Sequence, residues 1–93
     1  MHLHIDGARI FNALAKYNCK PSDLSGMYDS MTICLSKALS CPTGAIVVGK
    51  KDFVHQLRFI RKSLGGGMRQ IGVLCAAGIY ALDHMIPEVK KDN

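Results

Sequence analysis

The sequence contains no tryptophan, and phenylalanine and tyrosine contribute only three residues each. So few aromatic rings leave little surface on which nucleic-acid bases could stack. The net charge of +5 would attract an anionic partner, but the basic residues are scattered along the chain rather than gathered in one block. A small basic nucleic-acid-binding module is therefore a weak interpretation, and we expect no nucleic-acid partner. An anionic small molecule or a second subunit is the alternative source of complementary charge.

Cysteine is present four times but never as a Cys-x-x-Cys pair, which argues against a zinc ribbon or a redox dithiol. Cys34 and Cys75 lie within apolar stretches, where a free thiol behaves as a small hydrophobic side chain. No apolar run approaches the roughly eighteen residues that a membrane-spanning helix needs, and no basic-then-apolar leader is visible. We therefore expect a reduced, cytoplasmic protein that does not cross a membrane.

Short β-prone runs alternate with helical patterns along the chain. Strands are expected at residues 1–6, 30–35 and 45–48, and helices at 9–17, 53–64 and 68–85. This alternation predicts an α/β fold in which helices cover a few buried strands. Three strands are fewer than the about five or six of an ordinary α/β sheet, so residues 1–93 are expected to form part of one larger domain.

The last expected helix carries an apolar stripe that is predicted to face the core. The stripe consists of Ile71, Leu74, Cys75, Gly78, Ile79 and Leu82. Pro87 and the charged residues that follow it are expected to lie beyond the end of this helix.

Asp6 is the first candidate for a chemical role. It follows a short β-prone run and precedes Gly7, and α/β proteins place ligand-binding side chains at such strand ends. One interpretation is that its carboxylate holds a protonated nitrogen of a ligand. The alternative is that Asp6 caps the helix expected from residue 9, a position that aspartate favours.

Lys37 is the second candidate, because it leaves a strand whose last residues are apolar. A lysine in that position is expected to be partly desolvated, and desolvation favours the neutral amine, which is the nucleophilic form. Ser36 beside it offers a hydroxyl that can donate a hydrogen bond to a phosphate. The alternative is an ordinary loop lysine in solvent.

Three consecutive glycines at residues 65–67 interrupt the helical pattern, since glycine is a poor helix former. Glycines before a helix N-terminus expose backbone N–H groups, and the guanidinium of Arg69 suits a phosphate or a carboxylate. The segment predicts either an anion-binding loop or a plain turn between two helices. It is not a Walker loop, because no Gly-Lys-Ser/Thr follows.

His2 and His4 form a His-x-His pair, and on a strand both side chains point to the same face. With Asp6 as a third ligand, such a pair could hold zinc and serve a metal-dependent hydrolase. The alternative is ordinary strand packing. His55 and His84 add no matching spacing, so we favour a protein without a metal site.

Three segments, taken in order along the chain, carry a resemblance to a known family. They are His4-Ile5-Asp6-Gly7-Ala8-Arg9, Ser30-Met31-Thr32-Ile33-Cys34-Leu35-Ser36-Lys37 and Arg61-Lys62-Ser63-Leu64-Gly65-Gly66-Gly67-Met68-Arg69-Gln70. Together with residues 76–82 they closely resemble the low-specificity L-threonine aldolases, which belong to the fold-type-I enzymes that depend on pyridoxal 5'-phosphate (PLP). The resemblance covers nearly the whole chain. It implies that residues 1–93 are the central part of the large, PLP-binding α/β domain of such an enzyme.

The resemblance also implies roles for individual residues at the cofactor. Lys37 matches the lysine that forms the Schiff base with PLP, and Asp6 matches the aspartate paired with the pyridine nitrogen. Arg9 matches the arginine beside the phenolic oxygen of the ring. Ser36 stands where the family has a serine that contacts the cofactor.

Lys62 and Arg69 match basic residues that reach the cofactor phosphate across a subunit interface. The resemblance therefore implies a homo-oligomer, a dimer or a tetramer, for the complete enzymes of the family. Its members cleave a β-hydroxy amino acid, threonine or allo-threonine, to glycine and acetaldehyde. PLP withdraws electrons as the Cα–Cβ bond breaks.

Two positions depart from the family's pattern. The family has glycine directly after the lysine and again two positions on, where this sequence has Ala38 and Ser40. Either residue is expected to strain the loop if its backbone needs a positive φ. Family chains are also several times longer, so we expect the 93-residue chain to be inactive alone. A non-catalytic remnant that associates with a full-length subunit is the alternative.

Overall fold

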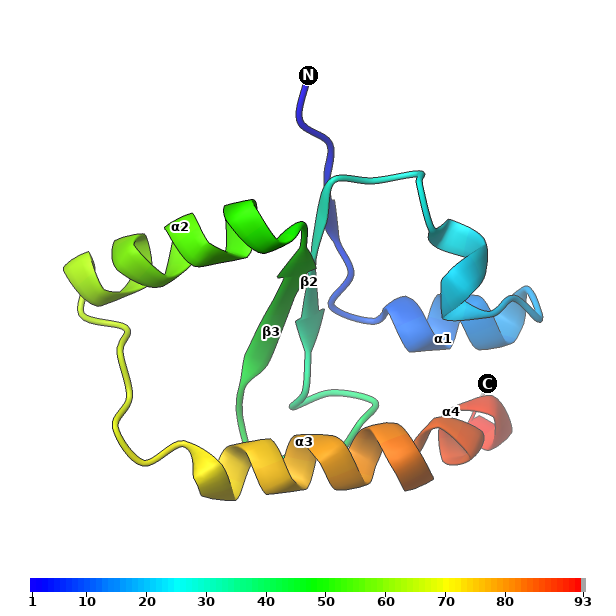
Figure 1. Ribbon diagram of the computed structural model, residues 1–93. Helices are drawn as coiled ribbons and strands as arrows, with labels where there is room; N and C mark the ends of the chain where they lie inside the picture. Colours follow the sequence, from blue (N-terminus) through cyan, green and yellow to red (C-terminus); the bar gives the residue numbers. More distant parts are fainter. Residues whose placement is uncertain (93) are drawn as a thin grey trace.

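The computed structural model describes residues 1–92, and strands and helices alternate along them much as the sequence predicts (Figure 1). The strands are β1 (His4–Asp6), β2 (Ser30–Cys34) and β3 (Ala45–Gly49). The helices are α1 (Ile10–Lys16), α2 (Lys51–Ser63), α3 (Gly72–His84) and α4 (Ile86–Asp92), with a short 3-10 helix at Pro21–Leu24. Within this described part of the chain, no helix combines the length and the apolar character required to cross a lipid bilayer.

The sheet has β2 in its centre, with β1 parallel to it on one side and β3 antiparallel to it on the other. His4 lies opposite Ser30 and Asp6 opposite Thr32 in the parallel pair. Because β1 and β2 are parallel, their carboxyl ends lie at the same edge of the sheet, meaning the edge at which these two strands end (Figure 1).

Burial differs between the strands. In β2, Ser30 is completely buried, and Met31 and Ile33 are buried as well. β1 and β3 alternate between exposed and half-buried residues, and Val47 is exposed. The expectation of buried strands is therefore met in full by β2 alone, because the other two strands stand at the edges of a three-stranded sheet.

The main core lies beyond the carboxyl end of β2, where the loop of residues 35–44 meets α3. Its buried members are Leu35, Leu39, Cys41 and Ala81, and the half-buried side chains packed against them are Phe11, Ile46, Ala77, Met85 and Ile86. The sequence predicts residues 36–44 only as a loop. Leu39, which is 2% exposed, instead makes this loop part of the core.

The chain continues as a helix beyond Pro87, contrary to expectation. α3 ends at His84, and α4 begins at Ile86 after a single turn residue, Met85. Pro87 is therefore in the first turn of α4, where a helix does not use the missing N–H. Val89 of α4 is 1% exposed, and α4 packs against both α1 and α3.

The molecule is thin, and much of α3 is uncovered. The extents of the molecule are 40 × 35 × 16 Å, and its radius of gyration is 14.0 Å. A compact domain of this length would have a radius of about 12 Å. The stripe predicted to face the core instead lines an open apolar groove of about 340 Å³ between α3 and the start of β3. Ala77 and Ala81, on a neighbouring face of α3, make the contacts with the core, and Gly78 is the buried member of the stripe.

Candidate functional site

Asp6 and Lys37 leave the sheet at the same edge. Asp6 is the last residue of β1, and Lys37 follows the last residue of β2, Cys34, by three positions. The two strands are parallel neighbours, so both segments emerge on the side of the sheet that faces α3 (Figure 1). Segments that are far apart in the sequence thus present a carboxylate and an amine at one edge.

The Asp6 carboxylate does not cap α1. Its Oδ1 accepts a hydrogen bond from the backbone amide of Ala8 over 3.2 Å, which closes a local turn. The residue at the N-cap is Arg9, and no side chain donates or accepts a capping hydrogen bond there. The helix-cap interpretation of Asp6 is therefore wrong, and the side chain remains exposed at the strand end.

The loop that carries Lys37 is anchored by buried leucines that precede and follow the lysine. Leu35 and Leu39 are buried, whereas Ser36 and Lys37 between them are exposed. The amide of Cys41 donates to the carbonyl oxygen of Leu35 over 2.9 Å, so the loop is closed at its base. The partial desolvation expected for Lys37 is absent within this chain, because the residue is exposed although its loop is anchored by buried side chains.

Of the two departures from the family's glycines, one has a conformational consequence. Ser40 has a φ of 62°, in the left-handed region that glycine adopts most easily. Ala38 is not among the residues with positive φ. The expected strain is therefore present at Ser40 and absent at Ala38.

Arg9 and Ser36 lie on the same two segments as Asp6 and Lys37. Arg9 is exposed at the start of α1, and its carbonyl oxygen accepts the amides of Asn12 and Ala13 over 3.1 and 3.3 Å. The two segments that leave the shared edge therefore carry the residues predicted for the pyridine ring, its phenolic oxygen and the covalent attachment.

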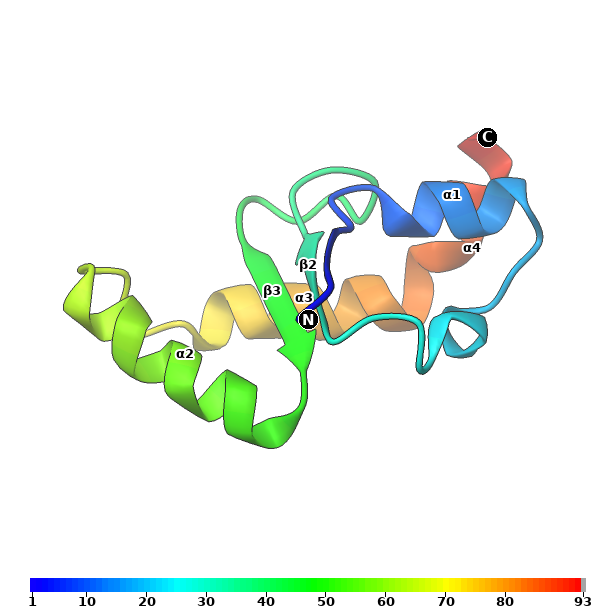
Figure 2. The same cartoon turned by 90° about the horizontal axis from the view of Figure 1, so that it is seen from above.

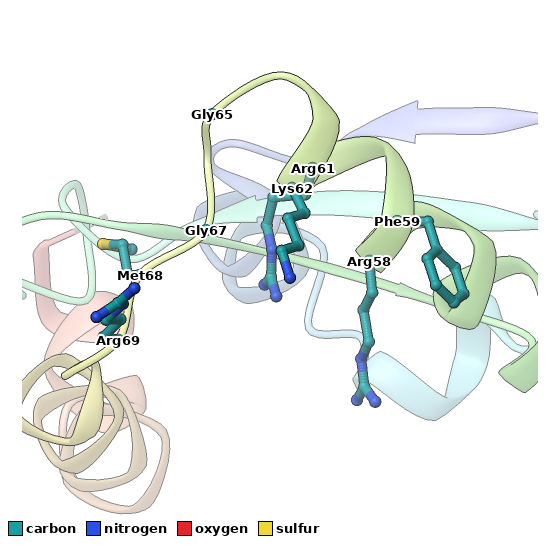
Figure 3. Close-up of a pocket in the computed structure, with 8 residues that line it drawn as sticks. All are labelled: Arg58, Phe59, Arg61, Lys62, Gly65, Gly67, Met68 and Arg69. Atoms are coloured by element: carbon teal, nitrogen blue, oxygen red, sulfur yellow. The ribbon is translucent and has the colours of Figure 1, made fainter.

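Lys62 and Arg69 lie elsewhere, in a basic hollow of about 520 Å³ (Figure 3). Its lining residues are Arg58, Phe59, Arg61, Lys62, Gly65, Gly67, Met68 and Arg69. Figure 3 shows three cations on one side of α2, facing the segment that carries Arg69. None of these four cations forms an ion pair with the side chains that the structure describes, those of residues 1–89.

The glycine run ends α2 rather than beginning α3. The amide of Gly66 donates to the carbonyl of Arg61 over 2.8 Å, and that of Gly65 to Lys62 over 3.1 Å. Gly65 has a φ of 81°, so these residues form the usual glycine cap of a helix C-terminus. α3 begins only at Gly72. The amides of Gly65 and Gly66 are therefore used in a helix cap, as the turn interpretation expects, and the positive charge of the hollow comes from side chains. Anion binding by this segment stays a prediction.

The basic hollow and the Lys37 edge are separate in one chain. In Figures 1 and 2 the end of α2 and the connection at residues 64–71 project away from α1 and from the loop after β2. The predicted cofactor residues thus fall into two groups. Asp6 and Lys37 share an edge, and Lys62 and Arg69 share the hollow.

The two histidines bond to hydroxyl groups of β2. His2 Nε2 and His4 Nδ1 lie 2.8 and 2.7 Å from the buried Oγ of Ser30, and His4 Nε2 lies 3.0 Å from Oγ1 of Thr32. Within residues 1–92 no group of three His, Cys, Asp or Glu side chains is placed to hold a metal ion. The Ser-x-Thr pattern of β2 could have predicted these hydrogen bonds, because its two hydroxyl groups have the same spacing along a strand as the two histidines.

Residues 1–93 match the family model of the beta-eliminating lyases over their whole length. The chain belongs to this family. It is 48% identical over 91 residues to the low specificity L-threonine aldolase of Escherichia coli strain K12. This alignment covers 98% of this chain and 27% of that protein. It is 47% identical over 91 residues to the low-specificity L-threonine aldolase 1 of Arabidopsis thaliana, covering 98% of this chain and 25% of the relative.

A solved structure has the same fold. The crystal structure of a Listeria monocytogenes protein assigned as an L-allo-threonine aldolase superposes with a TM-score of 0.89 at 23% identity, covering 98% of this chain and 25% of that one. The α/β class and the fold-type-I architecture are therefore confirmed. The chain spans about a quarter of the length of the curated relatives it matches.

Proposed function

We propose that this chain supplies the lysine-bearing part of a PLP-dependent aldehyde-lyase that cleaves L-threonine or L-allo-threonine to glycine and acetaldehyde. The observation that carries the proposal is the placement of Asp6 and Lys37 at one sheet edge, in a chain that belongs to the beta-eliminating lyases. The relatives named as threonine aldolases support the choice of a β-hydroxy amino acid as substrate.

The residues at this edge fit PLP, because the two segments that leave the paired strands carry an amine, a carboxylate and a guanidinium. Lys37 would hold the cofactor through its Nζ, and the buried Leu35 and Leu39 would keep its loop in place. Asp6, which is not used as a helix cap, would hold a proton at the pyridine nitrogen. Bound PLP supplies the electron sink for cleavage of the Cα–Cβ bond. Arg9 would contact the phenolic oxygen.

The basic hollow fits a role in a neighbouring subunit. Lys62 and Arg69 lie away from the Lys37 edge of their own chain, and no carboxylate within the described residues neutralises them. They would bind the phosphate of a PLP held by the Lys37 of another copy, while Ser36 would contact it from the lysine's own side. This arrangement would place each cofactor between two subunits of a homo-oligomer.

The 93-residue chain alone is expected to be inactive and to associate through its uncovered surfaces. Val73 is 79% exposed and Ile79 is 63% exposed on α3, and both outer strands of the sheet have an unpaired edge. Exposed apolar helix faces and free strand edges favour association. The relatives supply about three quarters of their length from outside this segment.

A chimera tests the proposal. Residues 1–93 replace the matching segment of the Escherichia coli relative, and acetaldehyde release from threonine is measured for the chimera and for the 93-residue chain alone. We expect cleavage by the chimera, loss of cleavage with Lys37→Ala, and little change with Lys50→Ala. A folded chimera that oligomerises but does not cleave threonine would favour the non-catalytic remnant. Cleavage by the isolated chain would show that less of the fold is needed than we propose.

A further inference from the structure

β1 pairs with β2 through only three residues, and its sequence repeats with a period of two. His2-Leu3-His4-Ile5 places a histidine on one face and an aliphatic side chain on the other at each step. A slip of β1 by two residues along β2 would therefore keep an aliphatic residue opposite Met31. The apolar pattern of β1 does not fix its register.

The bridge that His4 makes does not fix the register either. His4 bridges the hydroxyls of Ser30 and Thr32 through its two ring nitrogens, over 2.7 and 3.0 Å. In a forward slip, His2 would arrive opposite Ser30 and could make the same bridge. The contact of His2 with Ser30 over 2.8 Å, and the two bonds between Leu3 and Asp29 over 2.7 and 2.9 Å, favour the observed register.

Gly7 adds a steric barrier to the slip. Its amide donates to the carbonyl oxygen of Thr32 over 2.7 Å, which draws the two backbones together. A Cβ at this position would lie 2.9 Å from both Cγ and Sδ of Met31 and 3.0 Å from that carbonyl oxygen. Met31 is 3% exposed, so its side chain has little room to move. A forward slip would bring Ile5, with its Cβ, into the place of Gly7.

We infer that Gly7 is a positioning residue for Asp6, because it excludes the slipped pairing of β1. In the observed register Asp6 lies opposite Thr32, and in the forward slip it would lie opposite Cys34. The carboxylate would then be displaced by about 7 Å relative to the loop that carries Lys37. The consequence for cofactor binding rests on the proposed function, whereas the register itself does not.

The register can be read without any cofactor, by using the native Cys34 as a reporter. Asp6→Cys is introduced into the 93-residue chain, which is oxidised with copper phenanthroline and mapped by mass spectrometry. In the observed register the Cα atoms of residues 6 and 34 are about 8 Å apart, which is too far for a disulfide. In the slipped register these two residues lie directly opposite each other. Adding Gly7→Ala is expected to raise the yield of the bond from position 6 to Cys34 about tenfold, because it removes the steric part of the preference for the observed register.

Gly72→Ala is the matched control, because a Cβ there meets no atom within 4 Å. It should leave the yield of the disulfide at the level of Asp6→Cys alone. Equal yields with and without Gly7→Ala, whether high or low, would overturn the inference. So would an equal rise with Gly72→Ala.

A second measurement separates the inference from the proposed function. In the chimera loaded with PLP, Gly7→Ala should change the absorption band of the bound cofactor in the same direction as Asp6→Asn, while Gly72→Ala should not. A change with Asp6→Asn and none with Gly7→Ala contradicts the positioning role. If the disulfide yield rises as expected and the chimera binds no PLP at Lys37, the proposed function fails and the register assignment stands.

Discussion

The backbone amide of Ser40 donates a hydrogen bond to the carbonyl oxygen of Lys37 over 3.0 Å, and Ser40 makes this bond with a φ of 62°. A left-handed conformation costs a non-glycine residue about 1–2 kcal/mol. Glycine removes that cost but loses about 0.4–1 kcal/mol through the greater freedom of its unfolded chain. We therefore predict that Ser40→Gly raises the free energy of unfolding of the chimera by about 0.5 kcal/mol, as measured by urea denaturation.

The neighbouring position supplies the control for this change. Ala38 has no positive φ, so Ala38→Gly gains nothing from the flexibility of glycine and should lower the free energy of unfolding by about 0.4–1 kcal/mol. Opposite signs for the two substitutions would support the backbone geometry of the lysine loop. If both substitutions destabilise the chimera equally, the left-handed conformation of Ser40 is not a source of strain.

Asp6→Asn should separate chemistry from stability. The amide oxygen of asparagine can still accept the hydrogen bond from Ala8, and α1 does not depend on this side chain for a cap. The free energy of unfolding of the chimera should therefore change by less than about 0.5 kcal/mol. Threonine cleavage should slow on the order of a hundredfold or more, because the group that holds the proton at the pyridine nitrogen is lost. Turnover close to that of the unchanged chimera would leave Asp6 with only its local turn.

Arg69 provides a test of the shared site between subunits. Arg69→Gln should raise the PLP concentration needed for half-saturation of the chimera about tenfold, since a charge-assisted hydrogen bond to the phosphate is lost. Arg58→Gln removes a cation from the same hollow at a position that the family resemblance does not assign, so its effect should be smaller.

Mixing two defective chimeras gives the sharper result. A subunit with Lys37→Ala and a subunit with Arg69→Gln each lack one half of the site. In a mixed oligomer, one site would combine the intact Lys37 of one chain with the intact Arg69 of the other. Threonine cleavage should therefore reappear at low PLP on mixing. No recovery, despite proven subunit exchange, would place both residues at one site within a single chain.

Much of the fold could be predicted from sequence periodicity. The offsets of the apolar residues place α1 and α2 correctly to within about two residues, the usual accuracy of helix ends. The strand ends that carry Asp6 and Lys37 are correct as well. These features depend on local sequence, because they follow from which side chains recur at helical or strand spacing.

The features that the sequence did not reveal depend on contacts between distant segments. The parallel pairing of β1 with β2 brings Ser30 to both histidines, and nothing local in either strand predicts that register. Leu39 becomes buried only because α3 packs over its loop. The exposure of Lys37 was likewise mispredicted, since desolvation of a lysine at a strand end depends on which groups lie above it.

The attachment of PLP to Lys37 is the central claim, and its most direct test is chemical. The chimera is loaded with PLP, reduced with borohydride and digested, and the phosphopyridoxyl group is located by peptide mass mapping. The account predicts that the group is on Lys37, and that Lys37→Ala abolishes labelling of the segment contributed by residues 1–93. Labelling of Lys50 or Lys62 in place of Lys37 would contradict the account.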